Sequence, residues 1–489
     1  MKPMVQIRFR ERVDTFSVDP KYATTAAPKV LWIELTSKCP FDCVFCTRRV
    51  RFGTGQNLSF DVFERVIAEL DAPDFIGLNY SGESIYYPRL LDAIALAKST
   101  GAFTELVTAF STISKPLLQG IVESGLDRLA VSLHTMDPEQ YRSIYRFGSL
   151  DLLKQRVADF FELRGASGSL CPRLDFCFVA MNENLDQLPH VVAYAKSVGV
   201  PEVSIHPLIG RHLVPHDFSK ELRANRLRDE FKDELRSTIS NVESRHPGFP
   251  INVLNPDLDT NPTLSRIPQY FAPFLPPNAR IYSCDQSPFE SVHILASGNV
   301  VVCEVHDEVS LGNLHSQSLR EIWQGDAYRA FRQKYVVAEI PECRSCVWKF
   351  AYVPGEWTPS IDASHGASPQ LLRGWHPYDA SGSVWSKKRS VLALASPRAK
   401  THVHLRGTLP HDPDCEVNQL SIECNRVPIG SVRNIGSSFL SFDQTFALAD
   451  SDTIKHFEFV VEHLYRPYLR AEGKDGRDLG FALHRIELR

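Results

Sequence analysis

The sequence lacks three features that would each indicate a particular class of protein. No window approaches the roughly 20 apolar residues of a membrane-spanning helix. The charged N-terminus, MKPMVQIRFRERVD, has no apolar stretch of the kind found in signal peptides. The net charge of the 489 residues is only −4, which gives no broad attraction to nucleic acid or to an anionic membrane. We therefore expect a soluble, cytoplasmic protein whose main partner is neither nucleic acid nor a membrane.

The 11 cysteines are clustered along the chain, and in a reducing compartment such thiols serve as metal ligands or buried side chains more often than as disulfides. The segment SKCPFDCVFC, residues 37–46, has the spacing CxxxCxxC at Cys39, Cys43 and Cys46. A structural zinc site or a fully protein-held iron–sulfur cluster takes four ligands, and no fourth Cys or His follows closely. Three thiolates would leave one iron of a four-iron cluster open to another ligand.

Short apolar runs alternate with helical patterns from about Val30 to Pro207, which predicts repeated βα units and a parallel sheet. The six runs are VLWIELT, FIGLNYSGE, FTELVTAF, LDRLAVSLH, RLDFCFVAMNE and EVSIHPLIG. We therefore predict an α/β fold with a partial (β/α)6 TIM-like barrel. In such folds the chemistry lies at the C-terminal ends of the strands.

The remainder of the chain predicts two further domains. The segment SVHILASGNVVVCEV, turning at residues 297–299, predicts a hairpin, and the helical pattern that follows completes a small α+β domain. Alternating strands in the last quarter predict a β-sandwich. The predicted organisation is an N-terminal extension (1–28), the barrel (29–262), the α+β domain (263–375) and the β-sandwich (376–489).

On these motifs the chain resembles the radical S-adenosylmethionine (SAM) enzymes. In that family CxxxCxxC, with an aromatic residue where Phe45 stands here, binds a 4Fe-4S cluster whose free iron is chelated by SAM. The family's GGEP segment is similar to SGES at residues 81–84, in which Gly82 and Glu83 match and Ser84 replaces proline. The resemblance implies that Glu83 accepts hydrogen bonds from the SAM amino group.

The resemblance implies three further contacts with SAM, each at or after the end of a predicted strand. Ser132 is placed like a polar contact of the family, Arg142 would help to bind the SAM carboxylate, and Asn182 would lie on the adenosine side. A Ser or Asn at a strand end is also a common turn residue. The implied mechanism is one-electron reduction of the cluster, with a flavodoxin- or ferredoxin-type protein as donor, followed by SAM cleavage to a 5′-deoxyadenosyl radical and hydrogen abstraction.

A second cysteine set lies in the predicted α+β domain, at Cys284, Cys303, Cys343 and Cys346. Four thiolates can hold either zinc or a complete iron–sulfur cluster. The surrounding LGNLHSQSLREIWQG and IPECRSC resemble the twitch-type, short SPASM extensions of radical SAM enzymes. That resemblance implies one auxiliary 4Fe-4S cluster, which would accept or supply an electron.

The substrate predicted from these features is a small molecule or glycan. The C-terminal segment is similar to β-sandwiches beside sugar-handling enzymes, so we expect hydrogen abstraction from a sugar or cyclitol, followed by dehydrogenation or epimerisation. Epimerisation needs a thiol donor, for which Cys177 is the candidate, although a mid-strand Cys is by default a buried inert thiol. His206, at the end of the sixth strand, would bind the substrate or act as a base, or be purely structural.

Two alternatives remain. The first is a radical SAM enzyme that modifies a peptide, which we disfavour because the 28 residues before the barrel are too few for a leader-binding domain. The second is a non-enzymatic scaffold in which both cysteine sets hold zinc and the β-sandwich binds a glycan.

Overall fold

The computed structural model divides the chain into two compact units, one formed largely by residues 1–255 and 283–349 and the other largely by residues 350–489. The structure describes residues 27–181, 183–207, 229–253, 277–284, 286–304, 307, 309–346, 349–352, 357–366, 368, 370–376, 378, 381–396, 398–411, 415–425, 427–448, 454–465, 467, 477 and 479–489. Within them, no helix is long and apolar enough to cross a membrane.

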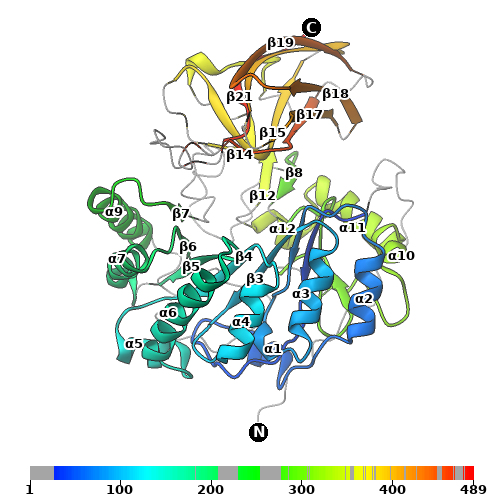
Figure 1. Ribbon diagram of the computed structural model, residues 1–489. Helices are drawn as coiled ribbons and strands as arrows, with labels where there is room; N and C mark the ends of the chain where they lie inside the picture. The colour runs from blue at the N-terminus through cyan, green and yellow to red at the C-terminus, as the bar shows by residue number, and fades with distance from the viewer. Residues whose placement is uncertain are drawn as a thin grey trace. The chain divides into compact units, whose positions relative to one another are not determined.

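A parallel sheet forms the centre of the first unit (Figure 1). Its strands pair in sequence order and are β1 (Val30–Ile33), β2 (Phe75–Gly77), β3 (Phe103–Thr108), β4 (Arg128–Ser132), β5 (Arg173–Ala180), β6 (Val203–Pro207) and β7 (Ile251–Val253). The predicted α/β class and partial barrel are thereby confirmed. Strand β7 extends the sheet beyond the six predicted strands, and its three residues are too few to give a clear alternation in the sequence.

Helices connect these strands, as repeated βα units require. They are α1 (Arg48–Phe52), α2 (Phe60–Ala68), α3 (Leu90–Lys98), α4 (Lys115–Glu123), α5 (Pro138–Tyr145), α6 (Leu150–Ser167), α7 (Leu188–Val198) and α9 (Asp229–Arg245). Polar residues cap several of them. The Asp137 carboxylate accepts a hydrogen bond from the amide of Gln140 at 2.6 Å, and the Ser149 hydroxyl accepts one from Leu152 at 3.2 Å. Such caps satisfy amides that the first turn of a helix leaves unpaired.

The two faces of the sheet differ in what they contact. Phe176 of β5 stacks on Tyr194 of α7, with ring centroids 5.8 Å apart, so its face is covered by helices. Cys177 lies on the opposite face, where the register aligns it with Ser132 of β4 and Ser204 of β6. Because helices surround a βα barrel, this second face is the barrel interior.

The hairpin of the second cysteine region extends the same sheet. Strand β9 (Ser291–Ile294) pairs in parallel with β1, and β10 (Asn299–Val301) and β11 (Gly312–Asn313) follow in antiparallel order. The predicted hairpin is confirmed, with Gly298 at φ +80° in its turn. Helices α10 (Leu319–Trp323), α11 (Asp326–Val336) and α12 (Pro341–Ser345) come next, and β8 (Arg280–Cys284) pairs with β12 (Lys349–Tyr352).

The second unit is built on a nine-stranded sheet, which confirms the predicted C-terminal β domain. Its strands are β13 (Ser360–Asp362), β14 (Leu371–Trp375), β15 (Val384–Ala395), β16 (His402–Pro410), β17 (Asn418–Cys424), β18 (Val427–Asn434), β19 (Phe439–Ala447), β20 (Ile454–Val461) and β21 (Ala482–Leu488). Leu405, Phe457 and Phe481 belong to its buried core. Strands β13 and β14 join this sheet although they precede residue 376, and the predicted boundary at residue 262 lies outside the described residues.

Candidate active site

The CxxxCxxC loop follows the C-terminal end of β1. Two backbone hydrogen bonds attach it to the end of α5, from Asp42 to the Tyr145 carbonyl at 3.2 Å and from Val44 to the Ile144 carbonyl at 3.0 Å. A turn closed by the Cys46 amide on the Cys43 carbonyl at 3.0 Å then reverses the chain. These constraints bring the thiols of Cys39, Cys43 and Cys46 within electrostatic reach of one another.

The surroundings of these thiols suit a bound cation. Burial, with the Glu83 charge adding to it, raises the pKa of Cys39 to about 12, and burial raises the pKa of Cys43 well above its usual value. Positively charged iron would offset both effects, because metal binding favours the thiolate. In the described part of the chain no three His, Cys, Asp or Glu side chains are arranged to hold a single metal ion. A four-iron cluster differs in that each thiolate binds a separate iron, so the donor set fits a cluster.

The Ser81–Ser84 segment packs directly against the strand end that leads to Cys39. A Cβ atom on Gly82 would lie 2.0 Å from the Thr36 carbonyl oxygen and 2.8 Å from the Ser37 Cα, so only glycine fits there. The next amide, that of Glu83, donates to the Lys38 carbonyl at 2.9 Å. The two motifs recognised in the sequence therefore lie side by side.

The Glu83 carboxylate is only half satisfied. The residue is 4% exposed, and its Oε2 accepts a hydrogen bond from the Ala109 amide at 2.7 Å. Among the described residues, its buried Oε1 has no hydrogen-bond partner. Burial raises the pKa of Glu83 to about 7 against the lowering effect of the Ala109 hydrogen bond. A buried acceptor of this kind fits an ammonium group such as the amino group of SAM.

Aromatic rings connect the cysteine loop with the end of β4. The Phe45 ring meets His134 edge-on at 5.1 Å, and His134 stacks on Tyr145 at 5.1 Å. The Tyr145 hydroxyl donates to the Ser132 carbonyl at 2.8 Å, which places Phe45 and Ser132 in one neighbourhood. Burial lowers the pKa of His134 to about 3, and its Nδ1 accepts from the Val179 amide at 3.1 Å, so the imidazole is neutral.

The two remaining predicted SAM contacts are less defined. Arg142 lies on α5 with an exposed side chain. Asn182 falls outside the described residues. The roles of both residues stay predictions.

Cys177 and His206 both lie on the barrel interior. The Ser204 hydroxyl donates to Cys177 Sγ at 3.3 Å, and burial raises the pKa of Cys177 to about 11, which keeps it a thiol at neutral pH. Two residues closer to the C-terminal ends of the strands, on the same face, Val179 aligns with His206. Burial, followed by the charge of Arg128, lowers the pKa of His206 to about 4. Its buried Nε2 lacks a partner among the described residues, so a neutral imidazole is available to a ligand.

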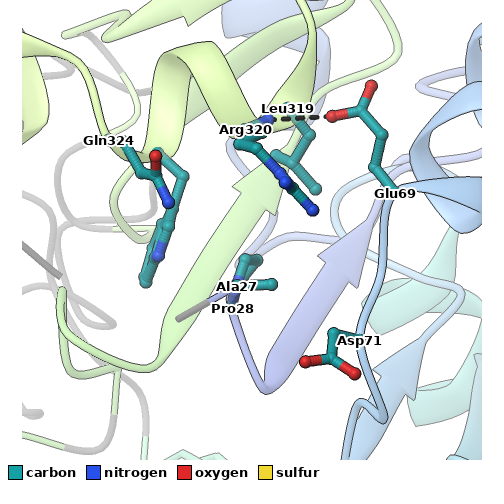
Figure 2. Close-up of a pocket in the computed structure, with 8 residues that line it drawn as sticks. Ala27, Pro28, Glu69, Asp71, Leu319, Arg320 and Gln324 are labelled. Atoms are coloured by element: carbon teal, nitrogen blue, oxygen red, sulfur yellow. Dashed lines mark hydrogen bonds between the residues drawn. The ribbon is translucent and has the colours of Figure 1, made fainter. Parts of the chain in front are cut away.

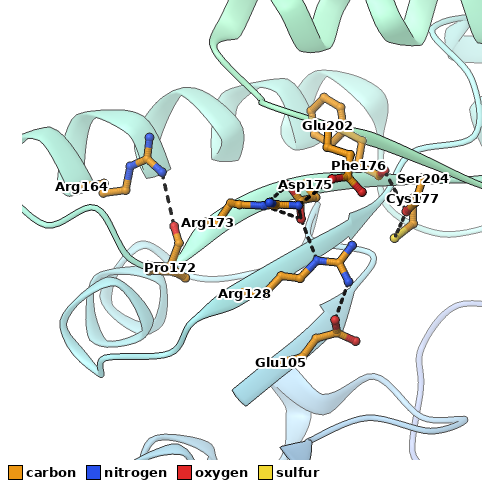
Figure 3. A network of polar contacts seen from close by, with 10 residues as sticks. All are labelled: Glu105, Arg128, Arg164, Pro172, Arg173, Asp175, Phe176, Cys177, Glu202 and Ser204. Atoms are coloured by element: carbon orange, nitrogen blue, oxygen red, sulfur yellow. Dashed lines mark hydrogen bonds and ion pairs between the residues drawn. The ribbon is translucent and has the colours of Figure 1, made fainter. Parts of the chain in front are cut away.

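An ionic network lies closer to the N-terminal ends of the strands than Cys177 and His206 (Figure 3). It was not predicted from the sequence. Arg128 of β4 contacts Glu105 of β3 at 2.5 Å and Asp175 of β5 at 2.7 Å. Arg173 contacts the same Asp175 at 2.8 Å and Glu202 at 2.8 Å. The available signal was the presence of charged residues inside FTELVT, RLAVS and RLDFCFVA, where a helix-covered strand would be wholly apolar.

The four cysteines of the second set also converge. Cys343, at the centre of α12, lies within electrostatic reach of Cys284, Cys303 and Cys346, and burial raises its pKa well above the usual value. The Cys346 amide donates to the Cys343 carbonyl at 3.3 Å, and the Lys349 ammonium donates to the Cys346 carbonyl at 2.6 Å. Four thiols from three separate segments match in number the ligands that a complete four-iron cluster takes.

A cavity of about 100 Å³ lies elsewhere in this unit (Figure 2). Its lining includes Pro28, Glu69 and Arg320, and the Arg320 amide donates to Glu69 at 2.9 Å. Pro28 precedes β1, whereas Cys39 follows it. The cavity therefore lies at the strand end opposite the cysteine loop.

Two family models match the chain. The Radical SAM superfamily model matches residues 33–223, and the SPASM iron–sulfur cluster-binding domain model matches residues 284–347. These ranges contain all seven cysteines of the two sets.

Curated relatives cover about two thirds of the chain. The PqqA peptide cyclase of Ruegeria pomeroyi is 26% identical over 338 residues, which are 66% of this chain and 80% of the relative. The PqqA peptide cyclase of Gluconobacter oxydans is 23% identical over 330 residues, 65% of this chain and 82% of the relative. Among solved structures, Streptococcus suis SuiB bound to S-adenosylmethionine has a TM-score of 0.48 at 15% identity, covering 63% of this chain and 68% of SuiB.

These relatives overturn the expected substrate. The prediction of a sugar or cyclitol substrate, with dehydrogenation or epimerisation, is wrong, because relatives that match two thirds of the chain are named PqqA peptide cyclases. The error arose because the sugar prediction was based on a likeness of the last quarter of the chain to sugar-handling enzymes, whereas the family matches end at residue 347.

Proposed function

We propose that this chain, which belongs to the radical SAM superfamily and carries a SPASM cluster-binding domain, is an enzyme that modifies a peptide. The observation that carries the proposal is the match to two PqqA peptide cyclases over 330 and 338 residues. Alignments of this length extend beyond the residues of the Radical SAM match, so the likeness is not confined to the part that binds SAM.

SAM and two 4Fe-4S clusters are the cofactors of this protein. We assign Cys39, Cys43 and Cys46 to the cluster that binds SAM. We assign the four cysteines of the second set, Cys284, Cys303, Cys343 and Cys346, to the auxiliary cluster. The proposed electron donor is a flavodoxin- or ferredoxin-type protein.

Bound at these residues, SAM and the reduced cluster would supply the radical chemistry that removes a hydrogen atom from the substrate. The chain's own residues position the reactants. Glu83 Oε1 would accept hydrogen bonds from the SAM amino group, and the absence of a side chain at Gly82 lets the backbone of the segment approach the cysteine loop. The Phe45 ring packs edge-on against His134 and would help to keep water away from one side of the site.

On the interior face, the neutral His206 imidazole offers its Nε2 as a hydrogen-bond partner for the peptide backbone or a side chain. The Cys177 thiol lies two residues deeper along the strands, beside Ser204. The hydrogen-donor role predicted for Cys177 stays a prediction.

The substrate class can be tested by the release of 5′-deoxyadenosine. Anaerobically reconstituted wild type, reduced with dithionite and supplied with SAM, is incubated with a pool of synthetic peptides or with a pool of sugars and cyclitols. We expect the peptide pool to increase the release several-fold and mass spectrometry to detect peptides that have lost hydrogen. The Cys39→Ala/Cys43→Ala/Cys46→Ala variant is the control and should release none. Stimulation by the sugar pool alone would show that the proposed substrate class is incorrect.

A further inference from the structure

Tyr335 is a buried residue with no role in the proposed mechanism. It lies near the end of α11 and is 1% exposed. In the part of the chain that the structure describes, its hydroxyl has no hydrogen-bond partner of conventional geometry. Burial of a hydroxyl without a hydrogen-bond partner lowers the stability of the fold. We therefore expect this hydroxyl to contact a specific group when the site is filled.

The groups around this hydroxyl are the cysteines of the second set. Cys284 is close enough to form a side-chain hydrogen bond with Tyr335, and Cys343 and Cys346 lie within its electrostatic reach. A tyrosine phenol carries its proton at neutral pH, so the hydroxyl can act as a neutral donor to sulfur.

The local fold holds Tyr335 in this position. Its ring packs between Phe289 and Phe331, each with a centroid 6.5 Å away. Directly after α11 the chain reverses at Ala338, whose amide donates to the Tyr335 carbonyl at 3.0 Å, and it then enters α12 with Cys343. This turn links the backbone of Tyr335 directly to the segment that carries Cys343.

We propose that Tyr335 donates an O–H···S hydrogen bond to the Cys284 thiolate and thereby raises the reduction potential of the auxiliary cluster. The inference rests on the proposed assignment of the four cysteines to that cluster. Its physical reason is that reduction adds negative charge to the cluster and its sulfur ligands. A donor aimed at a ligand sulfur stabilises the reduced form more than the oxidised form.

Tyr328 provides a matched control on the same helix. It is equally buried and lies within electrostatic reach of Cys303, but its hydroxyl donates to the Ser291 carbonyl at 3.3 Å. Tyr328→Phe and Tyr335→Phe each remove one buried hydroxyl from α11. Only the second removes a donor directed at a cysteine of this set.

The test uses the Cys39→Ala/Cys43→Ala/Cys46→Ala variant as parent, because the auxiliary cluster is then the single source of the EPR signal. After anaerobic reconstitution, iron content and an EPR-monitored redox titration are measured for the parent and for the parent with each Tyr→Phe change. We expect about four irons per chain in all three proteins, by the ligation of one four-iron cluster. The midpoint potential should become more negative in Tyr335→Phe and remain near the parent value in Tyr328→Phe.

The other outcomes distinguish a failure of the role proposed for Tyr335 from a failure of the auxiliary-cluster assignment on which it rests. Equal potentials in the parent and Tyr335→Phe, or equal shifts in both Tyr→Phe proteins, would overturn the role of Tyr335 and leave the cluster assignment intact. Loss of iron only in Tyr335→Phe would also overturn it, because the residue would then serve assembly of the site. A parent without iron would overturn the auxiliary-cluster assignment itself.

Discussion

Glu83 combines two hydrogen-bonding states in one buried carboxylate. Oε2 is held by the Ala109 amide, whereas Oε1 is buried and has no partner among the described residues. The hydrogen bond at Oε2 fixes the orientation of the side chain, and the unpaired Oε1 remains available as an acceptor. Because the pKa of Glu83 is raised to about 7, an ammonium ligand that pairs with Oε1 would favour the ionised form.

Glu83→Gln should therefore weaken SAM binding without loss of iron. Glutamine can keep the hydrogen bond from the Ala109 amide, but it removes the charge that pairs with the SAM amino group. A hydrogen bond to a charged group contributes about 1.5–3 kcal/mol, so the Kd for SAM should rise roughly 10- to 100-fold. Anaerobic equilibrium dialysis with labelled SAM measures this change. Glu64→Gln, at an exposed position on α2, is the control, and equal affinities in the two variants would contradict the assignment.

At the scale of elements, strands β3, β4 and β5 are connected inside the barrel by charge as well as by backbone hydrogen bonds (Figure 3). Arg128 bridges Glu105 and Asp175, which are 5% and 0% exposed. Desolvation makes each of these ions costly in isolation, and their mutual contacts offset that cost. The network occupies the lower interior, and Cys177, Ser204 and His206 are above it.

Arg128→Met should destabilise the barrel by about 3–5 kcal/mol, because two buried carboxylates lose their shared cation. Urea unfolding followed by far-UV circular dichroism measures the loss. Arg173→Met is the matched control. Its side chain is 42% exposed, and Asp175 keeps Arg128 as a partner in that variant, so the loss should be smaller. Equal losses would show that Arg128 does not hold the network together.

At the scale of the whole molecule, the two compact units have separate buried cores. Both cysteine sets belong to the first unit, whereas Leu405 and its neighbours belong to the second. The chemistry proposed here thus depends on side chains of the first unit.

Leu405→Ala should consequently destabilise the C-terminal β domain and leave the cofactors in place. Leu405 is 1% exposed, and truncation of a fully buried leucine costs about 2–5 kcal/mol through lost burial and the cavity that remains. Thermal unfolding and the iron content of reconstituted protein are the two measurements. Ile435→Ala, at a side chain that is 77% exposed, is the control. A large loss of iron in Leu405→Ala would show that the cluster sites depend on the second unit.

Features encoded in short segments could be predicted without the structure. The spacing of Cys39, Cys43 and Cys46 is a ligand pattern, and Ser297–Gly298–Asn299 forms a turn that needs a positive φ at glycine. The alternation of apolar runs and helical patterns likewise predicted the parallel sheet. Each of these signals depends on a few neighbouring residues, whose chemistry is independent of the rest of the chain.

The sequence by itself thus determined the barrel, the two cysteine sets and the pairing of CxxxCxxC with a Gly-Glu segment. Only the tertiary structure decided that β9 pairs with β1, that Arg128 lies between Glu105 and Asp175, and that Tyr335 lies near Cys284. These contacts join residues far apart along the chain. They arise when apolar faces pack and strands take a register, and no local spacing or periodicity specifies which distant partners then meet.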